Sequence, residues 1–302
     1  MSGLLFVVSL LLSASSFAEN KIHSLALHYD KSDDVIEIPF LEREYSLQPE
    51  TVELSYSYQY SEQVILSVSS LRGRHDDSNS FELESKLSDY SASVSYLMGL
   101  WSWDFGFSVF RDDSALSTTL PSTELFSALP TPFDIDIRYN EEYRSTDFFV
   151  GGSYDLEWRD FILTPSLRLG HQTSELESLL EGGRSNFNAY VDTKDESSGG
   201  YLAPALSMAY LWAGSDMLLW LPSVSLSWSE IIWGDIDSRS SMRLLGNDST
   251  ANSTESAKSG AGLISTSLML VFDAFYTDLS FSQTINTEPK SKSVSLLLGL
   301  NF

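Results

Sequence analysis

The sequence predicts an all-β fold, a transmembrane antiparallel up-and-down β-barrel of about twelve strands, with ten or fourteen strands as the alternatives. Three observations lead to this prediction. Apolar and polar side chains alternate over several long segments, tight turns alternate with long polar stretches, and no apolar run after the first residues is long enough for a spanning helix. Alternation that continues for the length of a bilayer favours a barrel wall with one face in lipid over a strand of a soluble sandwich.

The composition is that of an acidic protein. The 302 residues include 42 acidic and 18 basic side chains, which gives a formal net charge of −24, and no cysteine. Nucleic-acid phosphates need clustered Lys and Arg, so this charge excludes nucleic acid as a partner. Without cysteine the chain has no disulfide and no thiolate metal site. We expect no cofactor and no dedicated metal site, only weak binding of divalent cations to acidic loops.

The first residues have the pattern of a secretory signal. A short apolar run from Leu4 to Leu12 precedes Ser16-Phe17-Ala18, which places small residues where a signal peptidase requires them. An anchor helix is the less favoured interpretation, because a spanning helix needs about 20 apolar residues. We therefore predict a signal peptide at residues 1–18, cleaved before Glu19, and a barrel at residues 19–302.

The predicted strands follow one another along the remaining chain. At 51–60, five apolar or aromatic residues alternate with five polar ones without an exception. Such segments run for about 9–13 residues, whereas soluble strands usually stop near 5–6 and a tilted strand needs about 9–11 to cross a bilayer. Tyr and Trp near the segment ends suit the aromatic girdles where lipid meets water. The predicted elements are a strand at 22–29, hairpins at 51–72, 86–111, 146–173, 200–230 and 261–284, and a last strand at 293–302.

The connections alternate between two kinds. Tight turns are expected at 60–63, 99–100, 159–160, 213–216 and 273–274, and long polar loops at 31–50, 73–85, 112–145, 174–198, 231–260 and 285–292. Short turns on one rim and long loops on the other are typical of outer-membrane barrels. Within one of these loops, Ser174 to Leu180 is expected to form a short helical turn with Ser174 as its cap.

The last ten residues, SVSLLLGLNF, are similar to the C-terminal assembly signal of bacterial outer-membrane barrels. The residues that match alternate on one face of the strand: Val294, Leu296, Leu298, Leu300 and Phe302. This resemblance implies an outer-membrane location in a Gram-negative cell, lipid and lipopolysaccharide as surroundings, and the barrel assembly machinery as a partner. Strand number and size also resemble the translocator barrels of autotransporters. Because only about 30 residues precede the strand at Thr51, the resemblance implies a solitary barrel without a passenger.

Charged side chains on the polar face of the strands are expected to face the lumen. They are Glu53, Asp104, Asp155, Glu157, Arg168 and Asp278. Arg168 can reach Asp155 or Glu157 across the 146–173 hairpin, and the excess of acids favours cations over anions in any open passage. The first functional hypothesis is therefore a barrel without enzymatic activity, either an autotransporter-like barrel lacking a passenger or a narrow cation-preferring channel with acidic external loops.

The alternative is an outer-membrane esterase, a phospholipase or lipid A deacylase, that uses His171. Barrel lipases resemble this region in holding a His two residues before a Ser on the external face, with an Asn or an acid that orients the base. Here Thr173 occupies the second position, and Ser174 is next to it with the opposite parity. Asn186 or Asn188 is the candidate third member. A weaker template is an outer-membrane protease, which His75-Asp76-Asp77 and His28-Tyr29-Asp30 loosely resemble.

Overall fold

The computed structural model describes residues 23–38, 43–77, 82–121, 134–184, 187–215, 218–244, 247–256, 260–286 and 291–302. No helix in these ranges is long and apolar enough to cross a membrane. The predicted signal peptide lies outside the described residues.

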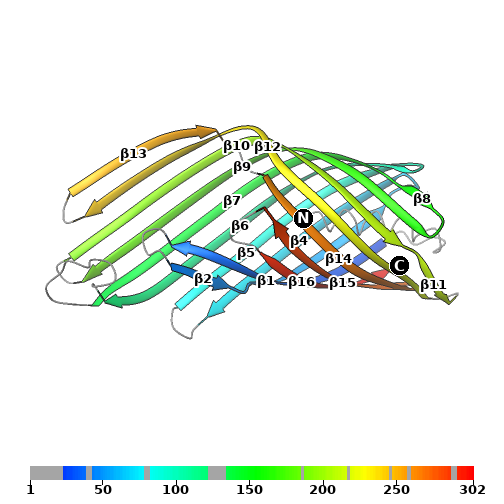
Figure 1. Cartoon of the computed structure of the whole chain (residues 1–302), viewed down its shortest axis with the longest axis horizontal. Coiled ribbons are helices and arrows are strands. Elements are labelled where there is room, and N and C mark those ends of the chain that lie inside the picture. Colours follow the sequence, from blue (N-terminus) through cyan, green and yellow to red (C-terminus); the bar gives the residue numbers. More distant parts are fainter. Residues whose placement is uncertain are drawn as a thin grey trace.

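The described residues form one 16-stranded sheet, and twelve of its strands close into a barrel in which each pairs antiparallel with its neighbours (Figure 1). The twelve strands are β1 (His23–Ile38), β3 (Glu50–Gln59), β4 (Val64–Asp77), β5 (Glu82–Met98), β6 (Trp101–Pro121), β7 (Asp134–Tyr154), β9 (Phe161–Arg184), β10 (Phe187–Tyr210), β12 (Leu218–Leu244), β14 (Gly260–Phe272), β15 (Phe275–Ile285) and β16 (Lys292–Asn301). The other four strands are β2 (Arg43–Leu47), β8 (Leu156–Trp158), β11 (Trp212–Ser215) and β13 (Asn247–Ser256). The predicted fold class and the strand number of twelve are confirmed.

The first and last strands close the barrel. β1 pairs with β16 from Ser24 opposite Asn301 to Asp33 opposite Lys292. Beyond that ladder, the amide of His23 donates to the carbonyl of Phe302 at 3.0 Å, and the amide of Phe302 donates back at 2.9 Å. The two rings stack with centroids 5.5 Å apart. Closure removes the free edges that would otherwise recruit another chain.

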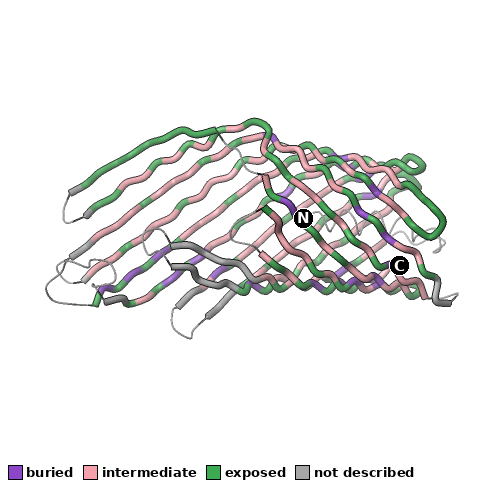
Figure 2. The backbone as a smooth tube through the Cα atoms, viewed as in Figure 1, coloured by how far each residue is buried: buried purple, intermediate pink, exposed green. Residues whose placement is uncertain are grey.

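The two faces of the barrel wall differ in chemistry, and exposure alternates along the strands (Figure 2). On the inner face, serine hydroxyls pair across neighbouring strands with Oγ–Oγ distances of 2.5–2.9 Å. The outer face carries exposed apolar residues, which we call the apolar belt: Leu25, Leu27, Val52, Leu54, Leu66, Val68, Val94, Phe105, Phe107, Val109, Phe148, Val150, Leu167, Leu169, Leu206, Val224, Leu226, Ile264, Leu279, Phe281, Val294, Leu296 and Leu298. A wall of this kind is stable only where its outer face meets a hydrocarbon medium.

The wall is much taller on one side of the barrel than on the other (Figure 1). β6, β7, β9, β10 and β12 have 21 to 27 residues, whereas β14, β15 and β16 have 13, 11 and 10. The tall part continues past the apolar belt, and β12 there pairs with β13. We call this part the extension, which comprises 111–121, 134–146, 173–198 and 233–256.

The extension corrects the prediction of long loops. Most of the stretches predicted as loops at 31–50, 73–85, 112–145, 174–198 and 231–260 are strands. The predicted helical turn at Ser174–Leu180 lies inside β9. The backbone of that segment pairs with β7 on one side and with β10 on the other, so its peptide groups are satisfied as a strand. The prediction failed because these strands lack the apolar face that identified the others.

Four of the five predicted tight turns, at 60–63, 99–100, 159–160 and 273–274, fall where they were predicted. Gly99 adopts φ of 64°, a left-handed conformation that glycine accepts without steric cost, between β5 and β6. Arg159 and Asp273 also have positive φ at the two-residue turns after β8 and β14. The prediction of a turn at 213–216 was wrong for residues 213–215, which belong to β11 and pair with β12, while residue 216 lies outside the described residues.

Candidate functional site

The inner wall at the level of the apolar belt is acidic. The inward charged side chains are Glu53 on β3, Asp89 on β5, Asp104 on β6, Asp147 on β7, Asp278 on β15, His28 on β1 and Arg168 on β9. Asp104 and Asp278 are buried, with 7% and 8% of their surface exposed. Five carboxylates thus face one arginine and one histidine, so the lumen has a negative potential.

Asp89 and Asp147 were missed by the sequence reasoning. Each lies two residues from a side chain of the same face, Ser91 on β5 and Phe149 on β7. Strand parity was therefore a sufficient signal, but both residues lie outside the runs of apolar alternation that the prediction used.

Arg168 is held at the centre of the lumenal cluster. Its guanidinium lies over the ring of Phe149, 4.0 Å from the centroid. The hydroxyl of Tyr201 donates to Asp147 Oδ2 at 2.8 Å, and the Tyr201 ring lies against Gly170, where a Cβ would collide with it. The first contact orients Arg168, and the other two hold Tyr201 and Asp147 on neighbouring strands.

The predicted pairing of Arg168 with Asp155 or Glu157 was wrong. Asp155 accepts a hydrogen bond from Thr164 at 2.6 Å, and Glu157 lies exposed on β8 beside the turn. Thr164 precedes Arg168 by four residues on β9, which separates the two levels by about 13 Å. Among the described residues Arg168 has no ion pair.

The lumen contains open space beside this cluster. A cavity of ≈ 600 Å³ is lined by Asp104, Asp147, Arg168 and Tyr201 and, further round the ring, by Ser225 on β12 and Thr284 on β15. Within the described part of the chain, Oδ1 of Asp89, of Asp147 and of Asp278 is buried without a hydrogen-bond partner. No group of three or more His, Asp or Glu side chains among the described residues is arranged to hold a metal ion.

His171 lies on the outer face at the upper limit of the apolar belt. Its Nε2 is 3.4 Å from the hydroxyl of Ser198 on β10. Thr173 lies two residues above His171 on the same face, whereas Ser174 points inward and bonds Ser197 at 2.7 Å. A surface cavity of ≈ 1220 Å³ surrounds this group, with Trp233 also in its lining.

Ser198 could not be found from spacing along the chain. It comes close to His171 only because the β9–β10 register places Gly200 opposite that histidine and Ser198 diagonally across. Asn186 lies outside the described residues, and so does the side chain of Asn188. Of the protease-like groups, the side chain of His75 is also outside them, and His28 faces the lumen 3.5 Å from Glu53.

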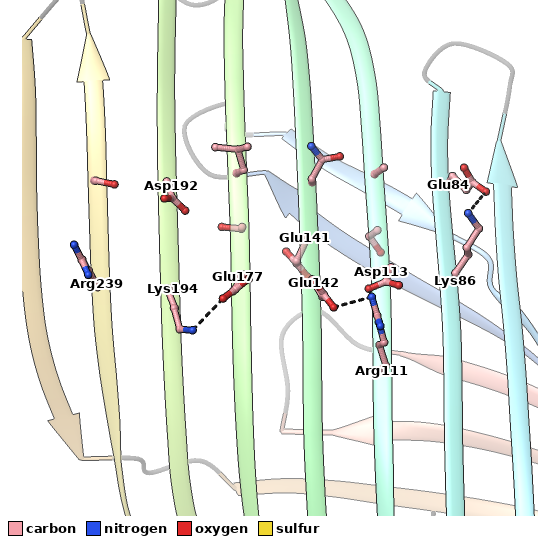
Figure 3. A pocket seen from close by; sticks show the side chains of 16 residues that line it. Glu84, Lys86, Arg111, Asp113, Glu141, Glu142, Glu177, Asp192, Lys194 and Arg239 are labelled. Carbon is pink, nitrogen blue, oxygen red and sulfur yellow. Dashed lines mark hydrogen bonds and ion pairs between the residues drawn. The ribbon is translucent and has the colours of Figure 1, made fainter.

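The outer face of the extension is a network of ion pairs across neighbouring strands (Figure 3). Arg111 on β6 reaches Glu142 on β7 at 2.8 Å, and Lys194 on β10 reaches Glu177 on β9 at 3.0 Å. The hydrogen bond from Lys194 lowers the pKa of Glu175 below its ordinary value. These groups line an open surface cavity of ≈ 780 Å³.

Two solved structures share this architecture. The translocator domain of the autotransporter NalP from Neisseria meningitidis aligns with a TM-score of 0.60 at 12% identity, covering 100% of this chain and 97% of that one. The β domain of the Bordetella autotransporter BrkA aligns with a TM-score of 0.57 at 10% identity, covering 94% and 100%. No protein-family model and no curated protein matches the sequence. At these identities the likeness shows the fold alone, a closed barrel like those of the two autotransporter domains.

Proposed function

We propose that the protein is an outer-membrane barrel whose narrow, acidic lumen conducts small cations. The observation that carries this proposal is the inner wall, where five carboxylates at the level of the belt are accompanied by Arg168 and His28 alone among the described charged residues. An excess of one charge in a narrow, low-dielectric passage raises the local concentration of the opposite ion. The proposed location rests on the apolar belt and on the likeness to two outer-membrane barrel folds.

Three carboxylate oxygens support passage of cations over a sealed core. A lumen closed by pairing would satisfy each carboxylate with a base or a donor. Instead, Oδ1 of Asp89, Asp147 and Asp278 lacks a partner in the described part of the wall. β5 and β7 lie on one side of the ring with β6 between them, and β15 lies across it, so acidic side chains face the lumen from two sides.

The test is a conductance recording in planar bilayers under a potassium chloride gradient. The purified barrel is expected to conduct, with a reversal potential of the sign that cation preference gives. The variant with Asp89→Asn, Asp147→Asn and Asp278→Asn should lose most of that preference. Asp113→Asn, on the outer face of β6, is the matched control and should leave the potential unchanged. A barrel that inserts but does not conduct, or that prefers anions, overturns the proposal.

The C-terminal strand is proposed as the segment that the barrel assembly machinery reads. Leu296 and Leu298 are exposed on the outer face, and Phe302 meets His23 where the first and last strands join. Any recognition of this strand would therefore coincide with the seam that closes the barrel. Removal of Phe302 should lower the amount of heat-modifiable, folded protein in outer membranes while leaving synthesis unchanged.

A second candidate function, an esterase, is favoured by one contact. His171 Nε2 lies 3.4 Å from Ser198 Oγ at the edge of the belt, within reach of an ester group in the outer leaflet. The esterase ranks second because the described residues provide no hydrogen bond to Nδ1 of His171, so nothing there orients the ring as a base requires. Hydrolysis of a phospholipid or p-nitrophenyl ester should disappear in His171→Ala and Ser198→Ala and persist in Ser174→Ala. Absence of hydrolysis in the unmodified protein removes this candidate.

A further inference from the structure

Basic side chains gather on one part of the outer face. Five of them project outward from four neighbouring strands and form what we call the basic patch: Arg72 and Arg74 on β4, Lys86 on β5, Arg111 on β6 and Arg144 on β7. The acids on the same face are Glu84, Asp113 and Glu142 within the patch, with Glu50 directly opposite Arg74 and Glu175 directly opposite Arg144 at its two sides. The positive charge is therefore concentrated in the lowest row of the patch, where Arg72, Arg111 and Arg144 share one ladder, on a chain whose formal charge is −24.

The register concentrates this charge. Arg111 lies directly opposite Arg144, and Arg74 lies directly opposite Lys86. Like charges in directly opposite positions destabilise a strand pair, so folding alone disfavours this arrangement. Glu142 offsets part of the repulsion, since it reaches both Arg111 and Arg144.

The lowest row of the patch contains no acid. It follows the ladder from Arg72 through Ser88 to Arg111 and Arg144. Arg72 makes no ion pair with any residue that the structure describes. The side chains of Arg111 and Arg144 keep 50% and 53% of their surface exposed despite their contacts with Glu142.

This row lies at the edge of the apolar belt. Tyr90 and Val109 are exposed at the edge of the belt, and each lies two positions, about 7 Å, from a residue of the row: Tyr90 from Ser88 on β5 and Val109 from Arg111 on β6. A lipid whose acyl chains cover the belt therefore has its headgroup at the height of the arginines. Guanidinium groups bind phosphate with paired, charge-assisted hydrogen bonds.

We infer that the basic patch binds the phosphate groups of lipopolysaccharide in the outer leaflet. This inference rests on the proposed outer-membrane location. The patch supplies positive charge at the height of the lipid phosphates, on the β4–β7 side of the barrel only.

The adjoining wall explains why the contact is one-sided. From β9 to β12 the same height carries Glu175, Glu177, Glu196, Asp235 and Asp237 around Lys194 and Arg239. Lys194 is held by three glutamates, Glu175, Glu177 and Glu196. That half of the wall repels phosphate, so an anionic lipid settles on the other half.

The test compares lipid A carrying two phosphates with dephosphorylated lipid A, each added to the folded protein in neutral detergent micelles. We expect the phosphorylated lipid to bind more tightly and its binding to weaken as salt rises. The row variant Arg72→Gln, Arg111→Gln and Arg144→Gln should lose about tenfold or more in affinity. The matched control, Lys194→Gln with Arg239→Gln and Arg243→Gln, removes equal charge from the acidic half and should bind like the unmodified protein.

The outcomes that overturn the inference are specific. Equal affinity for the two lipids, or an equal loss in the control, refutes a phosphate site in the basic patch. Complete displacement of the lipid by millimolar inorganic phosphate refutes the lipid source. Heat modifiability on gels confirms that each variant is folded. The row variant should retain cation conductance. If the unmodified protein conducts but does not bind lipid A, this inference alone is refuted. If it binds lipid A but does not conduct, the proposed channel alone is refuted.

Discussion

The belt and the extension are built by the same strands with opposite chemistry on their outer faces. β6 shows both, since Phe105 and Phe107 project from its lower half and Arg111 and Asp113 from its upper half. The inner face changes less, with serine pairs such as Ser57–Ser67 in the belt and Ser174–Ser197 in the extension. Only the outer face therefore changes with the surrounding medium, and its change from apolar to charged side chains marks the edge of the lipid.

The largest expected effect comes from placing a charge on either side of that limit. Phe105→Arg puts a guanidinium in the middle of the apolar belt and should cost about 2–4 kcal/mol in the free energy of unfolding from lipid vesicles. Ala115→Arg makes the same addition on the same face and strand, but in the extension, where exposed substitutions change stability by about 0.5 kcal/mol or less. Guanidinium titration of both variants measures the difference. Equal losses would contradict a lipid limit between the two positions.

A second comparison uses one substitution, Gly to Ala, in both regions. At Gly299 the added Cβ would collide with the ring of Tyr276, which is buried and bonds Ser24 at 3.1 Å. Overpacking of this kind costs about 1–3 kcal/mol. At Gly182 the nearest atom is Ile135 Cγ2 at 3.7 Å, which is an ordinary contact. Gly299→Ala should lower the unfolding midpoint in urea and Gly182→Ala should leave it nearly unchanged; the reverse order would show that the extension is the tighter region.

The same contrast explains what the sequence revealed. Twelve strands and their tight turns were predictable, because period-two apolar alternation and turn residues act locally. The extension was not, because its strands alternate between polar and charged side chains, a pattern that loops share. Ser198 and the opposition of Arg111 to Arg144 depend on register between strands, which spacing along the chain does not encode. The inward orientation of Asp89 and Asp147 could have been predicted from strand parity alone.

A third, smaller effect concerns the serine pairs of the inner face. Ser57→Ala removes a hydroxyl that lies 2.8 Å from Ser67 on the neighbouring strand. Cross-strand pairs of this kind contribute about 0.2–1 kcal/mol, so the variant should unfold at slightly lower denaturant. A double-mutant cycle with Ser67→Ala isolates the pair. A coupling energy of zero would mean that water in the lumen replaces the lost hydroxyl without cost.

The smallest effect is a pH dependence confined to the extension. The pKa of Glu175 is lowered by the hydrogen bond from Lys194, and that of Asp248 is lowered by Arg243. Carboxyl groups with a lower pKa in the folded state contribute stability above their unfolded pKa, about 4. That contribution disappears as the pH falls through the folded value. Glu175→Gln should therefore unfold more easily than the unmodified protein at pH 7, and the difference should shrink below about pH 4, the unfolded pKa, and vanish below the folded pKa. The burial of Phe105 in lipid involves no proton, so the loss of unfolding free energy in Phe105→Arg should stay constant over the same pH range. A parallel pH dependence in both variants would instead place the ion pairs and the belt in one environment.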